Sequence, residues 1–574
     1  MGIAHTASWK SKASFFVAGY ISARAYRSGR FAIANGAAGR SHGTCNCVIM
    51  LGQICHRRSL MPVIISVAQL KHALHQPGEI ALIDVREAGE SGEGRPLLAV
   101  NIPYSLLELR APKLAPCPRA RLVVMDNGSE DVRAARAYSR LVDMGYVDVH
   151  VLDGGLQAWE SAGHGVFKGV NVPSKTFGEL LEHACDTPSI GADELAELCA
   201  SKTPPVILDG RTPAEHDRMS IPGGVSCPNG ELGLRVSQLC EPDDLVVVNC
   251  AGRTRSIVGA QTLIDMGVPN RVVALRNGTM GWRLAGFELD QSSGLTHPLE
   301  TPPKVLEAAQ SSAKALAKAD GIETVTGAQV DSWLDSGSRS VFLLDVRTAA
   351  EFAAGHQSGA VHAPGGQLVQ ATDQWVGVRG AVLVLIDDEQ VRAPLVARWL
   401  QRMGHYAVVL APGDSVCARD AGVSAPQWSE LEKLSATAMP ADATVIDVRS
   451  SAAYDACHIN GSIWSIRPRL AELKLSGVVV LIADSEQIAA LAAGELTDSG
   501  AHVQGWLSGE PDAWQDAGLE LVSEPKLADS ERIDYLFFVH DRHDGNMAAA
   551  RAYLEWETGL LAQLDRDERS LFTL

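Results

Sequence analysis

The sequence predicts an α/β protein built from four tandem units, each a small parallel sheet flanked by helices on both faces. The main observation is a string that occurs four times, an apolar β-branched run ending in Asp-x-Arg. It lies at 82–86 (LIDVR), 207–211 (ILDGR), 343–347 (LLDVR) and 445–449 (VIDVR). Such runs are typical of buried strands. Strands that alternate with helices over about 100 residues indicate a parallel α/β domain.

A second apolar run follows each string, and it leads through one polar residue and a short loop into an amphipathic helix. The second runs lie at 122–125, 246–249, 383–386 and 480–483. Each helix is predicted to end at a glycine in a left-handed cap, at Gly145, Gly267, Gly404 and Gly500. Three units then close on a Gly/Trp signature, at 154–163, 277–286 and 508–518. Because ligands bind beyond the carboxyl ends of parallel strands, the loop after the second run is the predicted site of chemistry.

The chain length of 574 residues agrees with about four domains. The predicted divisions are a basic N-terminal extension (1–61), four domains (62–168, 188–292, 322–422 and 436–522) and a C-terminal helical segment (523–574). Residues 1–60 hold eight Lys or Arg and no Asp or Glu, which is typical of a transit peptide or an over-extended gene start. Of these two interpretations we favour the over-extended start.

Composition excludes several classes of protein. The net charge is −18, and because residues 1–60 contribute +8, the remainder carries −26. Such an acidic body argues against nucleic acid as a partner. No apolar run approaches the roughly 20 residues of a membrane helix, so no membrane insertion is expected. Eleven cysteines without paired spacings favour a reducing compartment. We therefore predict a cytoplasmic protein, or a mitochondrial one if residues 1–60 are a transit peptide.

The second unit alone carries a thiol at the loop position. Its loop reads Cys250-Ala251-Gly252-Arg253-Thr254-Arg255-Ser256. The backbone amides of Ala251 and Gly252 and the helix that follows can form a nest for an anion. Arg253 and Arg255 add two positive charges, and all of these groups favour thiolate over thiol. Cys250 is therefore the predicted nucleophile, and the other loop residues are predicted to bind the substrate. Thr254 and Ser256 either hydrogen-bond the thiolate or begin the helix.

These motifs together resemble the rhodanese family of sulfurtransferases. The resemblance rests on the Asp-x-Arg strands, the Cys-x4-Arg loop, the closing Gly-x3-Trp and GHIPGA-like stretches at 220–225, 355–361 and 457–463. It covers residues 62 to about 522 and implies four tandem rhodanese-like domains. It also implies that Cys250 takes a sulfane sulfur from a small anionic donor, such as thiosulfate, and passes it to a thiol, protein or cyanide acceptor. No cofactor and no metal are predicted, and the oligomeric state is left open.

The repeated Asp209–Arg211 pair is predicted to brace the loops at the end of its strand. Two-domain thiosulfate enzymes of this family have a donor-binding arginine where this chain has Glu215, so recognition of thiosulfate through that position is not implied. The other three units place Asp126, Asp387 and Asp484 at the thiol position, and a carboxylate cannot carry sulfur. These three units are predicted to be catalytically inactive.

Two alternatives to a sulfurtransferase follow from the same residues. One is a persulfide-carrying or redox-sensing scaffold, in which Cys250 is reactive but turns over slowly. The other is a phosphatase or arsenate reductase, which the loop length disfavours. Phosphatase relatives of the family insert one more residue between Cys and Arg, whereas four residues separate Cys250 from Arg255.

Overall fold

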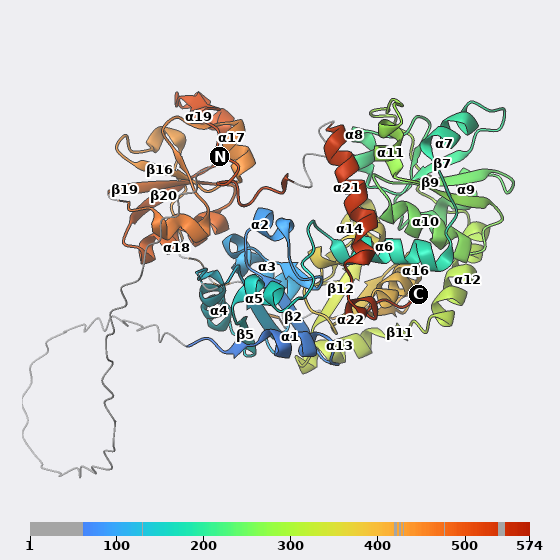
Figure 1. Cartoon of the computed structure of the whole chain (residues 1–574), viewed down its shortest axis with the longest axis horizontal. Coiled ribbons are helices and arrows are strands. Elements are labelled where there is room, and N and C mark those ends of the chain that lie inside the picture. The colour runs from blue at the N-terminus through green and yellow to red at the C-terminus, as the bar shows by residue number, and fades with distance from the viewer. Residues whose placement is uncertain are drawn as a thin grey trace, which may run out of the picture. The chain divides into compact units, whose positions relative to one another are not determined.

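The structure is a computed structural model that describes residues 61–574, except for 129, 418–421, 424–425, 427, 429, 476 and 538–545 (Figure 1). The predicted N-terminal extension lies outside the described residues, apart from Met61. The described residues belong to one compact unit of the chain. None of the helices described is long and apolar enough to cross a membrane.

The first three units share one sheet topology. The strand orders are β1-β5-β4-β2-β3, β6-β10-β9-β7-β8 and β11-β15-β14-β12-β13, and all of their paired strands are parallel. The strands of the first unit are β1 (Ile64–Ile65), β2 (Ile80–Asp84), β3 (Ala99–Asn101), β4 (Arg121–Met125) and β5 (Val149–Leu152). Its helices are α1 (Val67–Leu74), α2 (Ala88–Glu93), α3 (Leu107–Leu114), α4 (Arg133–Asp143) and α5 (Gly155–Ser161).

The second and third units repeat this arrangement. The second contains β6 (Ser189–Ile190), β7 (Val206–Asp209), β8 (Val225–Ser226), β9 (Leu245–Asn249), β10 (Arg271–Leu275), α6 (Val172–Cys185), α7 (Ala192–Cys199), α8 (Pro213–Arg218), α9 (Leu232–Leu239), α10 (Thr254–Asp265) and α11 (Gly278–Leu284). The third contains β11 (Thr324–Val325), β12 (Val341–Asp345), β13 (Val361–His362), β14 (Val382–Ile386), β15 (Tyr406–Leu410), α13 (Gly327–Ser336), α14 (Ala349–Ala354), α15 (Gly365–Gln370) and α16 (Arg392–Arg402). The helix α12 (Pro303–Ala319) connects them.

The fourth unit has a parallel sheet of order β18-β16-β19-β20. It contains β16 (Thr444–Asp447), β17 (His458–Ile459), β18 (Ile463–Trp464), β19 (Val478–Ala483), β20 (His502–Ser508), β21 (Leu521–Val522), α17 (Ser451–Ala456), α18 (Glu486–Asp498) and α19 (Pro511–Asp516). The edge strand of the other sheets is replaced by an isolated bridge from Lys433 to Trp506. The chain ends with α21 (Met547–Gly559) and α22 (Arg566–Arg569).

The repeated sequence strings occupy the central strands. Each Asp-x-Arg string ends one strand (β2, β7, β12 or β16), and each second apolar run forms the neighbouring strand (β4, β9, β14 or β19). These strands are buried on both faces, as parallel strands covered by helices are. The helix that follows each second run ends as predicted, since Gly145, Gly267, Gly404 and Gly500 all have positive φ, at 99°, 71°, 83° and 92°.

The first three units pack around one continuous hydrophobic core. It combines Ile83 and Leu107 of the first unit with Phe177 and Ile257 of the second and Leu344 of the third. All five side chains are at most 2% exposed. The site in the second unit is therefore held by a scaffold that spans three units.

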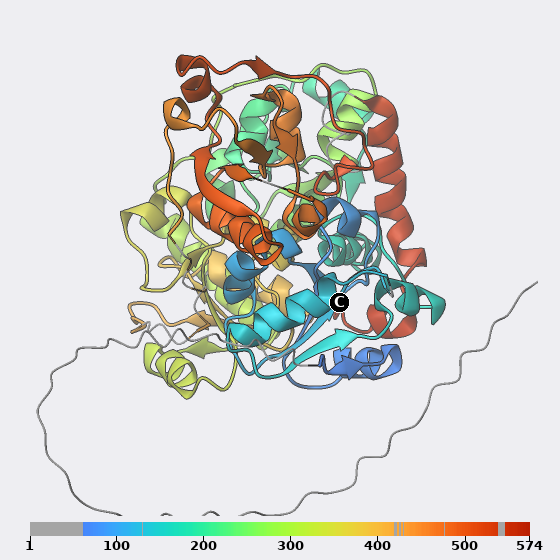
Figure 2. The ribbon, with the colours of Figure 1, turned by 90° about the vertical axis from the view of Figure 1, so that its left-hand side faces the viewer.

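The fourth unit lies beside the first (Figure 2). A buried charged network connects the two units. Arg467 donates to both carboxylate oxygens of Glu108 at 2.5 and 2.7 Å and lies 3.0 Å from Glu495. Glu495 also accepts hydrogen bonds from Arg136 at 2.6 Å and from the hydroxyl of Tyr104 at 2.7 Å. Burial acts to raise the pKa of Glu495, but Arg467 and Arg136 outweigh it and lower this pKa to about 2.

This network predicts a pH-dependent contribution to stability. The pKa of Glu495 is lower in the folded chain than its unfolded value near 4.5, so the stabilisation is complete above about pH 4.5 and is lost as pH falls towards 2. We expect Glu495→Gln to cost roughly 3 kcal/mol at neutral pH, because it leaves buried guanidinium groups partly unpaired. The midpoint of thermal unfolding of Glu495→Gln should differ from that of the native protein by more at pH 7 than at pH 3. Glu307→Gln, on an exposed helix face, is the control. An equal difference at both pH values would contradict the assignment.

Candidate functional site

Cys250 follows the last residue of β9, at the carboxyl edge of the second sheet, and α10 begins four residues later at Thr254. The thiol is buried, with 2% of the residue exposed. The hydroxyl of Ser256, in the first turn of α10, donates a hydrogen bond to its Sγ at 3.2 Å. Of the two roles that the sequence left open for Ser256, the structure places the hydroxyl on the sulfur.

The first and third units reveal what the loop amides hold. In the third unit, Oδ2 of Asp387 accepts hydrogen bonds from the amides of residues 391–393 at 2.7 to 3.2 Å. In the first unit, Asp126 accepts from the amides of Gly128 and Ala134 at 3.1 and 2.9 Å. In each of these two units, the backbone amides of the loop thus form an amide cradle that surrounds and binds a carboxylate of the same unit. In the second unit, no described side chain accepts a hydrogen bond from the amides of residues 251–255.

The start of α11 fixes the carbonyl side of the reactive loop. The amide of Thr279 donates to the carbonyl of Cys250 at 2.8 Å, and that of Met280 donates to the carbonyl of Ala251 at 3.0 Å. The approach is so close that a Cβ on Gly278 would lie 2.1 Å from the carbonyl oxygen of Cys250. Gly278 also has a positive φ of 52°. The closing Gly/Trp signature therefore positions the reactive loop.

Asp209 and Arg211 form a buried bidentate pair, with Oδ2 of Asp209 2.6 Å from Nη2 of Arg211. Arg211 also donates to the carbonyl of Met219 at 2.5 Å, just beyond the end of α8. The same contacts recur in the other units, where the arginine is Arg86, Arg347 or Arg449. The pair thus holds the short helix α8 against the strand that precedes it.

Arg253 is paired with carboxylates on α6. Its guanidinium donates to both oxygens of Glu179, at 2.6 and 2.9 Å, and also to Glu182. A donor anion would have to compete with both carboxylates for this arginine. The role of Arg253 in substrate binding stays a prediction.

Arg255 is held by Glu215 on α8, with distances of 2.8 and 2.7 Å to the two carboxylate oxygens. It also donates to Gln367 of the third unit at 3.0 Å. Burial acts to raise the pKa of Glu215, but hydrogen bonds from Arg255 and Thr212 lower this pKa to about 2. The charge of Arg255 is therefore matched at neutral pH.

Equivalent pairs occur in two units that have no thiol, between Arg392 and Glu351 and between Arg133 and Glu90. This recurrence indicates that Arg255 braces the loop. Its predicted contact with a substrate stays a prediction.

Helix α21 covers the reactive loop, although it lies almost 300 residues further along the sequence (Figure 1). The hydroxyl of Thr254 donates to Oε1 of Glu557 at 2.8 Å. Glu557 is 1% exposed, and its Oε2 has no hydrogen-bond partner among the described residues. A Cβ on Gly252 would lie 2.9 Å from Cε of Met280 and 3.1 Å from this Oε2. Gly252 therefore permits the close approach of α21.

A cavity of about 150 Å³ touches the loop at Ala251. The helices α8, α11 and α21 form its walls, with Arg218, Met280, Arg283 and Met547 among the lining residues. Arg283 is exposed. Cys250 itself does not line this cavity, which reaches the loop at Ala251. The lining side chains include thioethers, guanidinium groups and the carboxylate of Glu215.

Two features of the site were missed in the sequence. The Asn277-Gly278 pair at the start of the closing signature was a usable signal, because the first unit has a glycine pair at the same place, Gly154-Gly155. The contact between Glu557 and the loop left no local signal, since the carboxylate lies on a helix outside the four repeats. Among the described residues, no group of three or more His, Cys, Asp or Glu is arranged to hold a metal ion.

Comparisons with known proteins agree with this geometry. The Rhodanese-like domain family model matches residues 66–162, 191–285 and 326–414, and thus the first three units. The crystal structure of thiosulfate sulfurtransferase from Pseudomonas aeruginosa is 39% identical, with a TM-score of 0.81, covering 89% of this chain and 99% of that one.

Two curated relatives match shorter regions. The putative sulfur carrier protein YrkF of Bacillus subtilis is 28% identical over 153 residues, which are 24% of this chain and 79% of the relative. A sulfurtransferase of Allochromatium vinosum is 29% identical over 105 residues, which are 18% of this chain and 96% of the relative. With these similarities and the repeated sheet topology, the chain belongs to the rhodanese-like sulfurtransferase family.

Proposed function

We propose that the protein is a sulfurtransferase that moves a sulfane sulfur from thiosulfate or a persulfide donor, through a persulfide on Cys250, to a thiol or cyanide acceptor. The observation that carries this proposal is the amide cradle. Two units hold a carboxylate in it, whereas the second unit places a thiol at its mouth. A cradle of this kind stabilises a thiolate, a persulfide anion and the anionic end of a donor.

The reaction is a double displacement. The thiolate of Cys250 attacks the outer sulfur of the donor, the donor's S–S bond breaks, and sulfite or a thiolate leaves with the electron pair. A nucleophilic acceptor then attacks the outer sulfur of the Cys250 persulfide. The second S–S bond breaks and returns Cys250 as the thiolate. The loop amides and the hydroxyl of Ser256 hold the negative charge in each state.

The cavity at Ala251 favours a donor with one small anionic end. The carboxylates that pair with Arg253 and Arg255 offset most of the charge of the loop. Arg283, at the wall of the cavity, is exposed and has no ion pair among the described residues. We propose that its guanidinium binds the anionic group of the donor as the donor enters the cavity.

Mass spectrometry tests the proposal directly. The purified protein is exposed to thiosulfate, mercaptopyruvate or glutathione persulfide and then digested. The expected result is a gain of one sulfur atom on the peptide that contains Cys250, and the donor that produces it identifies the donor class. A protein that gains no sulfur from any of the three donors, or gains it on another cysteine, overturns the proposal.

The assignment of Arg283 predicts a change in KM. Arg283→Gln is expected to raise the KM for thiosulfate roughly tenfold with little change in kcat, since it removes one charge-assisted contact with the incoming donor. The measurement is steady-state thiocyanate production over a range of thiosulfate concentrations. Arg271→Gln, at another exposed arginine of the same unit, is the matched control. A KM that does not change, or that changes equally in the control, would show that Arg283 does not bind the anionic group of the donor.

We also propose that the fourth unit is a diverged copy of the same domain. Its order β18-β16-β19-β20 corresponds to β3-β2-β4-β5 of the first unit, and its Asp447–Arg449 pair matches Asp209–Arg211. Because Asp126, Asp387 and Asp484 stand at the thiol position, these three units serve packing or partner recognition rather than sulfur transfer.

The carrier alternative keeps one observation in its favour, the 2% exposure of Cys250 beneath α21. A carrier would accumulate a stable persulfide and deliver it to a protein acceptor, with slow turnover of small acceptors. Rapid steady-state turnover with cyanide would exclude it. A persulfide that persists in cyanide but is discharged by a protein thiol would establish it.

A further inference from the structure

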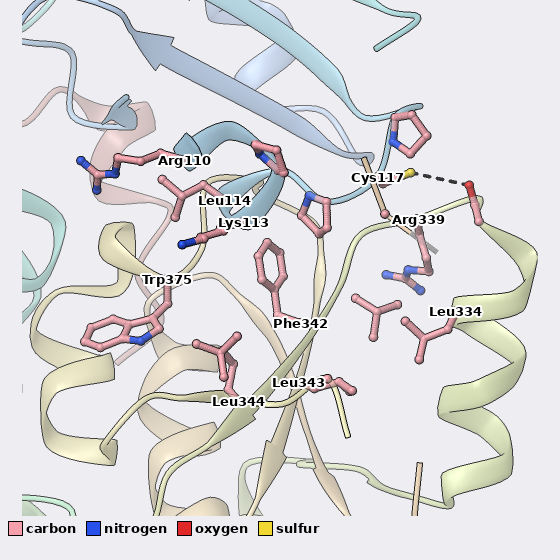
Figure 3. A pocket seen from close by; sticks show the side chains of 18 of the residues that line it. Arg110, Lys113, Leu114, Cys117, Leu334, Arg339, Phe342, Leu343, Leu344 and Trp375 are labelled. Atoms are coloured by element: carbon pink, nitrogen blue, oxygen red, sulfur yellow. Dashed lines mark hydrogen bonds between the residues drawn. The ribbon is translucent and has the colours of Figure 1, made fainter. Parts of the chain in front are cut away.

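A second cavity, of about 400 Å³, lies between the first and third units and contains no residue of the reactive loop (Figure 3). Its volume is within the range of roughly 300–1,000 Å³ that is usual for sites of small molecules, and such sites are common at interfaces between domains. No residue proposed for sulfur transfer lines this cavity.

The walls of the cavity are apolar and come from two units. Helix α3 contributes Leu114, and β12 contributes Phe342 and Leu344, which are 2%, 6% and 1% exposed. Strand β13 pairs with β12 only through Leu344 and Asp345, so the first half of β12 faces the cavity at the edge of its sheet. Trp375 adds an aromatic ring. A hydrocarbon or aromatic body would bury most of its surface here.

The charged side chains that line the cavity are all basic. They are Arg110, Lys113 and Arg339, and no Asp or Glu is among the lining residues, although the whole chain has a net charge of −18. In Figure 3 the ring of Phe342 stands between Lys113 on one side and Arg339 on the other. Within the described part of the chain, the side chains of Arg110 and Lys113 form no hydrogen bond or ion pair. Burial lowers the pKa of Arg110, and the charge of Asp373 offsets this effect only in part.

We propose that this cavity binds a small amphipathic anion, an aromatic or branched hydrocarbon body that carries one carboxylate, sulfonate or phosphate group. The body would contact Leu114, Phe342 and Leu344. The anionic group would lie at the rim, where Lys113 is exposed and Arg110 half-buried. Arg339 already lies 4.0 Å from a carboxylate oxygen of Glu79. A cation would meet the like charges of Arg110 and Lys113, and a neutral ligand would leave these two charges unmatched.

A fluorescence titration with 8-anilinonaphthalene-1-sulfonate tests the site in the full-length protein. The expected result is saturable binding to one site, with much weaker binding of N-phenyl-1-naphthylamine, which has the same body without the sulfonate. Displacement of the probe by 1-naphthoate or by 1-naphthyl phosphate distinguishes a carboxylate ligand from a phosphate ligand. Absence of saturable binding, or equal binding of the neutral analogue, overturns the proposal.

Two variants with matched controls locate the probe. Lys113→Gln is expected to weaken binding roughly tenfold, and Lys202→Gln, at an exposed lysine that does not line the cavity, to leave it unchanged. Val361→Trp should block the cavity, because Val361 lines it and is 53% exposed. The control is Ile463→Trp, since Ile463 is 42% exposed and pairs with β16 as Val361 pairs with β12.

Unfolding midpoints close to that of the native protein show that the variants are folded. Unchanged binding in both Lys113→Gln and Val361→Trp places the probe elsewhere and refutes the site. Cys250→Ser should bind the probe like the native protein, so this result is independent of sulfur transfer.

Discussion

Replacing Cys250 by Ser is expected to reduce sulfur transfer by at least roughly three orders of magnitude, to the level of the uncatalysed reaction. The hydroxyl that remains is too weak a nucleophile to take a sulfane sulfur, while the change of one atom leaves the loop and its contacts with α11 in place. The measurement is thiocyanate production from thiosulfate and cyanide.

The matched control is Cys227→Ser in the same unit. Cys227 is fully buried, and burial raises the pKa of its thiol well above the ordinary value, so it is an inert core residue. This control should keep its activity in proportion to the fraction of folded protein. Full activity of Cys250→Ser, or equal loss in both variants, would remove Cys250 from the mechanism.

The second large effect is expected from Gly278→Ala. The added Cβ would lie 2.1 Å from the carbonyl oxygen of Cys250, so either the loop or the start of α11 must move. Because the donor must meet a sulfur whose position the loop sets, we expect kcat to fall roughly a hundredfold. Persulfide formation on Cys250, followed by mass spectrometry, should slow by a similar factor.

Gly286→Ala separates this displacement from backbone strain. Gly286 also has a positive φ, of 92°, but an added Cβ there would meet no atom within 4 Å. We expect this control to lose some stability and to keep its turnover. If both variants lose turnover equally, the contact between Gly278 and Cys250 has no special role.

The sequence was sufficient for the strands, the repeats and the position of the thiol, because these depend on local patterns. The Asp-x-Arg strings and the capping glycines recur at fixed intervals, and Cys250 breaks the series of aspartates at one position. The family model supports three of the four predicted units, and the fourth has lost the paired edge strand of the others.

The environment of the two loop arginines could not be predicted from the loop itself. Glu179 belongs to the helix before the second sheet, and Gln367 belongs to the third unit. Both contacts depend on how the units pack, which no spacing within one repeat encodes. The same holds for Glu557, whose partner Thr254 is 303 positions away.

Because α21 packs against the reactive loop, the residues that surround the loop come from two distant parts of the sequence. A ribosome would complete the second unit long before it made Glu557, so the nascent site would carry an uncovered Met280 and Thr254. A fragment of residues 188–292 would lack α21, so Met280 and Thr254 would stay uncovered in it. A shortened protein that reproduces the environment of the reactive loop therefore has to contain both the second unit and α21.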